Sequence, residues 1–256
     1  MNAVILRHLP LGILVLALNR PQARNALNRQ LINELYTVLA DAAVDEAVRV
    51  VVLTGTDPAF CAGLDLKEIA QVGLTFFKTL DERNCIISVG EFPKPVIGAV
   101  NGPAFTGGLE LALACDFLIA SEHAVFADTH AAVGVMPAAG MTARLPAVVG
   151  GAQARRMSFT GEAIDAATAL RIGLVTEVVP HTELLDRAID SARRIAASPP
   201  IMTEQLKRVY CAGALAVMGE ALASEQRIAG EYNTDWDTFE QRRLEVLARN
   251  RAALRT

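Results

Sequence analysis

The sequence predicts an α/β fold built around buried, largely parallel strands. Short apolar runs rich in valine and isoleucine alternate with segments of helical spacing, and this alternation continues to about residue 180. Short continuous apolar runs are typical of strands that are covered on both faces, as in parallel sheets. After Pro180 the pattern is helical only, so we expect the chain to end in a helical part.

The N-terminal third is predicted to contain a hairpin followed by a helix. The apolar runs 4–7 and 13–18 flank a turn at Pro10-Leu11-Gly12, which favours a hairpin. Asn28 is a suitable N-cap for the helix. The apolar stripe of that helix recurs at a spacing of three to four residues, at Leu31, Leu35, Val38, Leu39 and Ala42.

The remaining elements follow from the same two patterns. Buried strands are predicted at 48–53, 96–100 and 117–120. Helices are predicted around Phe76, Phe77 and Leu80, over 107–114, and after Pro180 over 182–197, 202–218 and 222 to the end.

Composition and charge exclude several classes of protein. The 256 residues suit one large domain, and 52% hydrophobic residues exclude a disordered chain. A net charge of −4 argues against a nucleic-acid partner. The apolar run Leu11–Leu18 is far shorter than the roughly 20 residues of a membrane-spanning helix and has no leader pattern around it. We therefore expect no membrane association and a cytoplasmic location.

The cysteines and most histidines carry no recognisable site. The four cysteines form no C-x-x-C pair and show no ligand-like spacing to histidine, which predicts buried thiols and no metal site. His8, His123 and His181 are interpreted as structural. Trp236 is interpreted as a packing residue of the C-terminal helices.

Two glycine-containing segments are the candidates for chemistry. One covers residues 59–66 and the other covers 101–110, and each follows a predicted buried strand. Backbone N–H groups at the carboxyl ends of parallel strands favour anions, and two N–H groups from separate loops could form an oxyanion hole. Each segment taken alone is also explained as a turn, and Glu110 as a residue that complements a helix dipole. The residues by themselves indicate an α/β enzyme with an anion or acyl site.

The same segments resemble the signature stretches of the crotonase, or enoyl-CoA hydratase/isomerase, superfamily. The resemblance extends over most of the chain in one order, through Arg20–Asn28, Phe60–Leu66, Lys94–Gly102, Gly107–Asp116, Phe126, Gly134–Pro137, Gly140, Thr160-Gly161, Gly173–Val175 and Val178–Pro180. It implies a spiral of ββα units over residues 1–195 that carries an acyl-CoA site. It also implies a C-terminal helical trimerisation region over 196–256, with a homotrimer or a hexamer made as a dimer of trimers.

The resemblance also implies the roles of individual residues. The N–H groups of Leu64 and Gly107 would hold the thioester oxygen of an acyl-CoA substrate. Coenzyme A is then part of the substrate, and no separate cofactor is implied. Further contacts to the substrate or to coenzyme A are expected from Arg24, Ala26, Ala62, Gly63, Asp65, Leu66, Gly108 and Pro137.

One departure from the family pattern concerns the proton-transfer groups. The hydratases of the family use two glutamates, and the first corresponds to Glu110. The second, four residues after Phe126, is replaced by His130. Glu110 is expected to act as the base and His130 as the acid, because an imidazole exchanges protons near neutral pH. Asp128 is an auxiliary candidate that could orient His130 or substitute for it, and His130 could instead only shape the pocket.

Four activities are therefore consistent with the sequence. The leading hypothesis is hydration of a trans-2-enoyl-CoA. Alternatives within the superfamily are double-bond isomerisation and another enolate reaction such as thioester hydrolysis or decarboxylation. A non-catalytic acyl-CoA-binding protein is the fourth alternative, which product formation would separate from the other three.

Overall fold

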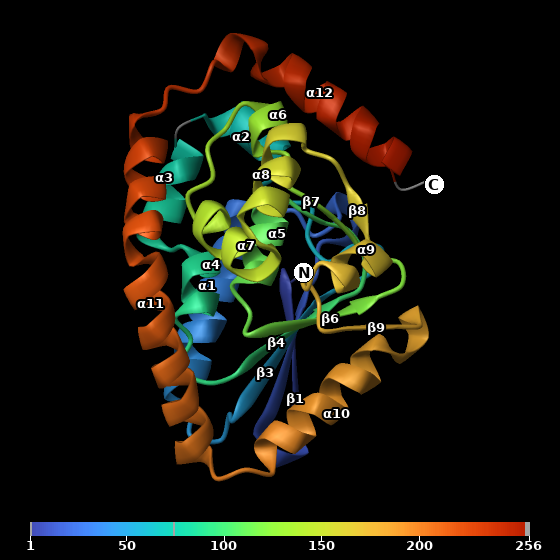
Figure 1. Cartoon of the computed structure of the whole chain (residues 1–256), viewed down its shortest axis with the longest axis vertical. Helices are drawn as coiled ribbons and strands as arrows, with labels where there is room; N and C mark the ends of the chain where they lie inside the picture. Colours follow the sequence, from blue (N-terminus) through green and yellow to red (C-terminus); the bar gives the residue numbers. More distant parts are fainter. Residues whose placement is uncertain (1, 74, 254–256) are drawn as a thin grey trace.

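The large sheet of the protein has the predicted parallel character. The computed structural model describes residues 2–73 and 75–253 and contains a sheet with the strand order β1-β2-β3-β4-β6-β9 (Figure 1). The β1–β2 pair is antiparallel and the other pairs are parallel. The strands are β1 (Val4–Leu9), β2 (Ile13–Leu18), β3 (Val50–Gly55), β4 (Val96–Val100), β6 (Phe117–Ser121) and β9 (Glu177–Val179). The α/β class is thus confirmed.

The N-terminal hairpin forms at the predicted turn. Pro10–Gly12 make a short 3₁₀ turn in which Leu11 and Gly12 both have positive φ. A Cβ on Gly12 would lie 2.5 Å from the carbonyl oxygen of Ala47, so only glycine fits there. The turn sets the register in which Val4 faces Leu18.

Burial on both faces explains why the central strands are continuously apolar. In β3, Val50 and Val52 pack with helix α10 (Leu184–Ala196) on one face. Val51 and Leu53 belong to the larger core on the other face. Because side chains alternate along a strand, a sheet covered on both faces needs apolar residues at every position.

A second, small sheet places segments that are distant in the sequence next to one another. It has the strand order β5-β7-β8, made of β5 (Ala104–Phe105), β7 (Val125–Ala127) and β8 (Ile164–Asp165). Two isolated bridges extend this layer, because Leu27 pairs with Leu64 and Cys61 pairs with Ala104. The layer therefore places residues 27, 61–64, 104–105 and 125–127 side by side.

The helices before α10 cover the larger core. Asn28 caps the first of them as predicted, because its Oδ1 accepts the N–H of Leu31 at 2.9 Å. These helices are α1 (Arg29–Val44), α2 (Leu66–Val72), α3 (Thr75–Glu82), α4 (Cys85–Gly90), α5 (Gly107–Leu113), α6 (His130–Val133), α7 (Met141–Val149), α8 (Gly151–Thr160) and α9 (Ala166–Arg171).

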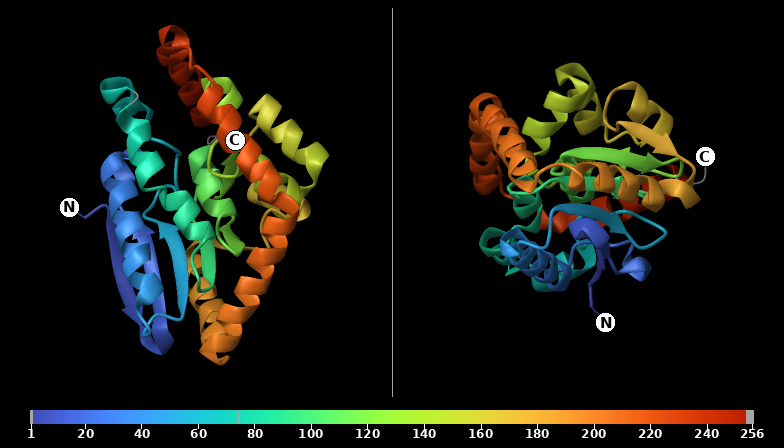
Figure 2. Two further views of the ribbon diagram at one scale, coloured as in Figure 1. Left: turned by 90° about the vertical axis from the view of Figure 1, so that its left-hand side faces the viewer. Right: turned by 90° about the horizontal axis from the view of Figure 1, so that it is seen from below.

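The C-terminal helices differ from the prediction in one respect. Residues Pro200–Glu231 form one continuous helix, α11, so the expected break between 218 and 222 is wrong. Gly219 lies inside this helix, as do Gly213 and Gly230, which shows that single glycines among good helix formers do not end it. Figure 2 shows α10 and α11 meeting at one end of the molecule, with α12 (Trp236–Ala253) at the opposite end.

Helix α12 folds back onto its own chain. It packs against α6, and its Phe239 and Val246 are buried in the larger core. Trp236 contacts Phe77 and Phe239, with ring centroids 6.3 and 5.1 Å apart, which agrees with a packing role. The division at residues 195 and 196 falls at the end of α10 and stays a prediction, as does the trimer. In the described part of the chain, every helix is too short or too polar to span a bilayer.

The cysteines are placed only partly as predicted. The four cysteines are free thiols, but only Cys61 and Cys85 are fully buried. His181, interpreted as structural, pairs with a carboxylate, because its Nε2 lies 3.2 Å from Asp57 Oδ2. The sequence did not indicate this pair because its members are brought together only by the fold.

Candidate active site

The two glycine-containing segments meet, as expected for loops that follow adjacent parallel strands. Strands β3 and β4 pair in parallel, so both loops leave the same edge of the sheet. The N–H of Phe105 donates to the carbonyl of Cys61 at 3.0 Å, which joins the loops directly. Gly108 allows helix α5 to approach closely, because a Cβ there would lie 2.0 Å from the carbonyl oxygen of Cys61.

The geometry of the loops brings two backbone N–H groups together. Gly63 accepts from Leu27 and Asp65 donates to Leu27, so the intervening N–H of Leu64 points to the other side of this bridge. A Cβ on Gly107 would lie 3.6 Å from the nitrogen of Leu64. Among the described residues, the N–H groups of Leu64 and Gly107 have no protein acceptor. Two such adjacent donors can hold a developing negative charge.

Thr106 holds the turn that precedes Gly107. Its backbone has φ 55° and ψ −116°, a conformation that residues with a Cβ adopt at a cost. The turn is fixed because the N–H of Thr106 donates to Ala127, and its hydroxyl bonds to that of Thr129 at 2.5 Å. The sequence analysis missed both threonines, and the only available signal was the position of Thr106 directly before the glycine pair.

A cavity of about 620 Å³ joins these loops to the predicted proton-transfer groups. Leu64, Glu110 and His130 line it, together with Ala62 and Leu66. Apolar side chains from α3, α4 and the segment after α6 form much of the remaining wall, among them Phe77, Leu80, Ile86, Ile87, Val135 and Met136. The C-terminal helices and the connection between them line the rest of the cavity with residues that the sequence did not indicate, namely Gln226, Ala229, Gly230, Tyr232, Thr234, Val246 and Leu247.

Glu110 and His130 face each other inside this cavity. Their nearest atoms, Glu110 Oε2 and His130 Nε2, lie 3.7 Å apart. The other ring nitrogen of His130, Nδ1, lies 2.7 Å from Asp128 Oδ1. All three side chains are buried, and Asp128 contacts the imidazole of His130 from behind; its auxiliary role stays a prediction. Asp128 cannot replace His130 in the cavity, because it lies behind the imidazole.

Burial and neighbouring charges shift the pKa of each group. Burial raises the pKa of Glu110, an effect that the nearby His130 opposes and the charge of Glu225 reinforces. Burial disfavours the charged form of His130, but the hydrogen bond to Asp128 and the surrounding carboxylates outweigh it and raise the pKa of His130. Burial likewise opposes ionisation of Asp128, but hydrogen bonds, chiefly from His130, lower its pKa. Both directions favour the protonated forms of Glu110 and His130.

The other predicted contact residues lie beside the cavity and do not line it. Arg24 and Ala26 are adjacent to the 62–65 loop, because the carbonyl of Arg24 accepts the N–H of Ala62. The carboxylate of Asp65 caps helix α2 and pairs with Arg20 at 2.9 Å. Pro137 is buried between lining residues. Contacts of these residues with coenzyme A stay predictions.

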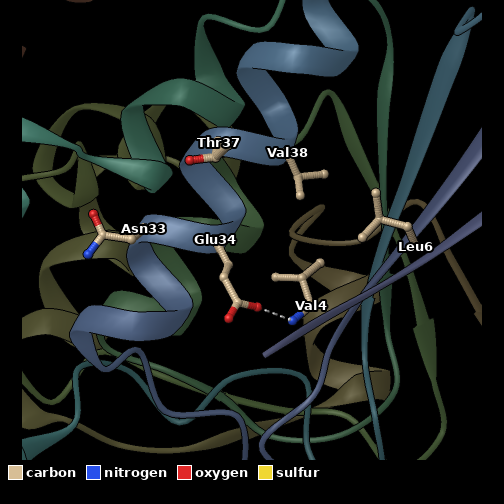
Figure 3. Close-up of a pocket in the computed structure, with 6 residues that line it drawn as sticks. All are labelled: Val4, Leu6, Asn33, Glu34, Thr37 and Val38. Carbon is tan, nitrogen blue, oxygen red and sulfur yellow. Dashed lines mark hydrogen bonds between the residues drawn. The ribbon is translucent and has the colours of Figure 1, made fainter. Parts of the chain in front are cut away.

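A second hollow, of about 260 Å³, lies between β1 and α1 (Figure 3). Its one ionisable lining residue is Glu34, whose carboxylate accepts the N–H of Val4 at 3.1 Å. That carboxylate is therefore engaged in holding the hairpin. In the part of the chain that the structure describes, no three His, Cys, Asp or Glu side chains gather as a metal site would require.

Comparison with known proteins shows the family to which the chain belongs. Residues 9–242 match the family described as enoyl-CoA hydratase/isomerase. The chain is 35% identical to a probable peroxisomal enoyl-CoA hydratase 1 of Arabidopsis thaliana, over 94% of this chain and 91% of the relative. It is 38% identical to the 2,3-dehydroadipyl-CoA hydratase of Escherichia coli, over 84% and 85% of the two chains.

Solved structures give the same result for the fold. The crystal structure of an enoyl-CoA hydratase from Mycobacterium tuberculosis superposes with a TM-score of 0.81 at 45% identity, covering 90% of this chain and 98% of that one. A monofunctional enoyl-CoA isomerase from M. smegmatis superposes at 0.74 with 34% identity, over 84% and 94% of the two chains. These likenesses confirm the predicted crotonase fold, and the chain belongs to the enoyl-CoA hydratase/isomerase family.

Proposed function

We propose that this protein hydrates a trans-2-enoyl-CoA and that Glu110 and His130 transfer the protons. The observation that carries this proposal is the 3.7 Å approach of Glu110 Oε2 and His130 Nε2 on the wall of the cavity that Leu64 also lines. A hydratase must deprotonate a water molecule and protonate the α-carbon, so it needs two such groups. Several of the curated relatives are named enoyl-CoA hydratases, which supports the same reaction.

The oxyanion contacts stabilise the intermediate of this reaction. Addition of water to the β-carbon pushes negative charge onto the thioester oxygen. The N–H groups of Leu64 and Gly107 would receive that charge, and each preorganised donor of this kind contributes about 3 kcal/mol to the transition state. The strained turn at Thr106 keeps the Gly107 donor in place before substrate binds.

The proton balance follows from the Glu110–His130 pair. Carboxylate Glu110 removes one proton from water as the hydroxyl adds to the β-carbon. Imidazolium His130 gives the proton on Nε2 to the α-carbon, while Asp128 accepts a hydrogen bond from Nδ1–H throughout. Transfer of the proton from Glu110 to His130 then restores the starting state. This transfer is possible because the two groups are neighbours.

The lining also indicates the class of acyl chain. Among the described lining residues there is no lysine or arginine, and Asp81 adds a carboxylate. An acyl chain with a terminal carboxylate would therefore find no lysine or arginine partner there and would meet the like charge of Asp81. We propose an uncharged, apolar acyl chain as the substrate class.

A hydration assay tests both parts of the proposal. Loss of the absorbance of the conjugated thioester is followed with crotonyl-CoA for the wild type, Glu110→Gln and His130→Ala. The exposed His123 lies outside the cavity, so His123→Ala serves as the matched control. We expect kcat to fall at least about 100-fold in the two cavity variants and to stay within twofold in the control. 2,3-Dehydroadipyl-CoA should give a kcat/KM at least about tenfold lower than crotonyl-CoA.

The outcomes separate the alternatives. Turnover that survives His130→Ala would make Glu110 the sole proton-transfer group and remove the acid role from His130. A wild type that converts a 3-enoyl-CoA but does not hydrate crotonyl-CoA would be an isomerase. Release of free coenzyme A would indicate a hydrolase, and binding without any product would indicate an acyl-CoA-binding protein. Each of these results contradicts the proposal.

A further inference from the structure

The start of helix α7 holds two buried carboxylates with alternate backbone N–H groups. Glu110 Oε1 accepts the N–H groups of Ala139 and Met141 at 3.0 and 3.3 Å. Glu225 accepts the N–H groups of the intervening residues Gly140 and Thr142, both at 2.6 Å. The segment 139–142 therefore lies between a proposed catalytic carboxylate on α5 and a second carboxylate on α11.

Glu225 is buried and accepts three hydrogen bonds. It is 4% exposed, and Thr142 adds a third hydrogen bond from its hydroxyl at 2.5 Å. Glu225 does not line the cavity, although its neighbour Gln226 does. The three groups that donate hydrogen bonds to Glu225 all belong to the segment that fixes Glu110. The hydrogen bonds of Glu225 therefore influence the cavity through that segment.

The alternation of donors couples the two carboxylates. Successive N–H groups of segment 139–142 point to opposite carboxylates, so a peptide rotation that releases Glu225 also turns the donors of Glu110. Gly140 has φ +108°, a conformation that leaves it free to rotate once its hydrogen bond to Glu225 is lost. Arg144 braces the same segment by donating from Nη1 to the carbonyl of Ala139 at 2.5 Å.

We propose that Glu225 is a positioning residue for the reaction: it holds segment 139–142 in the conformation in which two N–H groups fix the carboxylate of Glu110. This inference rests on the proposed function, because it gives Glu110 the role of the base. It adds a C-terminal helix to the catalytic apparatus through a residue that does not touch the substrate.

The charge of Glu225 gives this role a signature that packing alone lacks. Among the described residues, the charged groups that act on the Glu110–His130 pair are Asp128, Arg144 on α7 and Glu225 on α11, and Asp81 on α3 lines the same cavity. The negative charge of Glu225 raises the pKa of both Glu110 and His130. Loss of this charge is therefore expected to lower both pKa values.

Two substitutions separate the effect of the side-chain length of Glu225 from the effect of its charge. Glu225→Gln keeps the length and removes the charge, whereas Glu225→Asp keeps the charge and is one methylene shorter. Glu220→Gln is the matched control, because Glu220 is an exposed glutamate on the same helix. We expect kcat for crotonyl-CoA to fall about 10- to 100-fold in both Glu225 variants, with KM changed less than threefold. The control should match the wild type.

Histidine NMR supplies a readout that does not depend on turnover. The chain has four histidines, so His130→Ala identifies the Cε1 resonance of His130. Its titration midpoint should move to lower pH in Glu225→Gln and should stay nearer the wild-type value in Glu225→Asp and Glu220→Gln. Circular dichroism confirms that each variant is folded, and if Glu225→Gln does not fold, Glu225→Asp and Thr142→Val carry the test.

The outcomes distinguish this inference from the proposed function. A folded Glu225→Gln with wild-type kcat and an unshifted His130 titration overturns the positioning role, while Glu110→Gln still reports on the reaction. If Glu110→Gln retains full activity, the proposed function fails, and the NMR titration still shows whether Glu225 acts on the pair. Equal losses in kcat and in folded fraction, with no shift of the titration, would reduce Glu225 to a stabilising residue and contradict the proposal.

Discussion

Replacing Asp128 with asparagine isolates the hydrogen bond that orients His130. Asp128 Oδ1 accepts from His130 Nδ1 at 2.7 Å, and both side chains are buried. In Asp128→Asn the amide oxygen can still accept this bond, but the negative charge is lost. The substitution therefore changes the electrostatics of the site with little change in its shape.

The size of the effect follows from the loss of charge. A buried hydrogen bond to a charged group contributes about 1.5–3 kcal/mol. Asparagine keeps an acceptor for Nδ1–H but loses the charge, so the pKa of His130 falls. The imidazolium then loses its proton at lower pH, and because it is the acid that protonates the α-carbon, kcat on the alkaline side of the pH profile should fall about 10- to 100-fold.

The assay is the pH profile of kcat for crotonyl-CoA hydration. The alkaline limb, where His130 loses its proton, should move to lower pH in Asp128→Asn. It should stay in place in Asp190→Asn, which removes a carboxylate from an exposed ion pair on α10. An Asp128→Asn variant whose alkaline limb and rate equal those of the wild type would refute the assignment of His130 as the acid.

Two further predictions concern stability. Gly108→Ala should lower the free energy of unfolding by about 1–3 kcal/mol and reduce hydration, because the added Cβ would lie 2.0 Å from the carbonyl oxygen of Cys61. Urea denaturation measures this, and Gly213→Ala, where a Cβ meets nothing within 4 Å, should raise stability by about 0.5–1 kcal/mol. The second prediction concerns the pH dependence of the free energy of unfolding. Because the pKa of His130 is raised in the folded state, its contribution to stability is complete below pH 6.5 and is lost as pH rises through the folded-state pKa. The lowered pKa of Asp128 contributes stability above 3.8, and this contribution is lost on acidification. Urea denaturation should therefore show that the pair stabilises the fold most between about pH 4 and 6.5. His130→Ala should reduce the decline above that range, and the raised pKa of Glu110 accounts for the part that remains.

Local patterns predicted the elements that a single periodicity defines. The β4 strand was predicted at its observed limits because five apolar residues in a row have one explanation in a sheet buried on both faces. The start of α1 was predicted because asparagine caps a helix through its own side chain. Glycine was a weaker signal, since Gly219 lies within α11, where packing and the surrounding helix formers outweigh its flexibility.

The sequence by itself determined the α/β class and the two glycine-containing loops, which depend on residue type and spacing that can be read along the chain. Its resemblance to the crotonase superfamily implied Glu110 and His130 as the proton-transfer candidates. Only the tertiary structure decided that Nε2 of His130 faces Glu110, that Asp128 lies behind the imidazole, and that Glu225 secures the segment holding Glu110. The physical reason is that contacts between α5, α7 and α11 depend on how helices pack across the core, and no local periodicity records which residues a distant helix will meet.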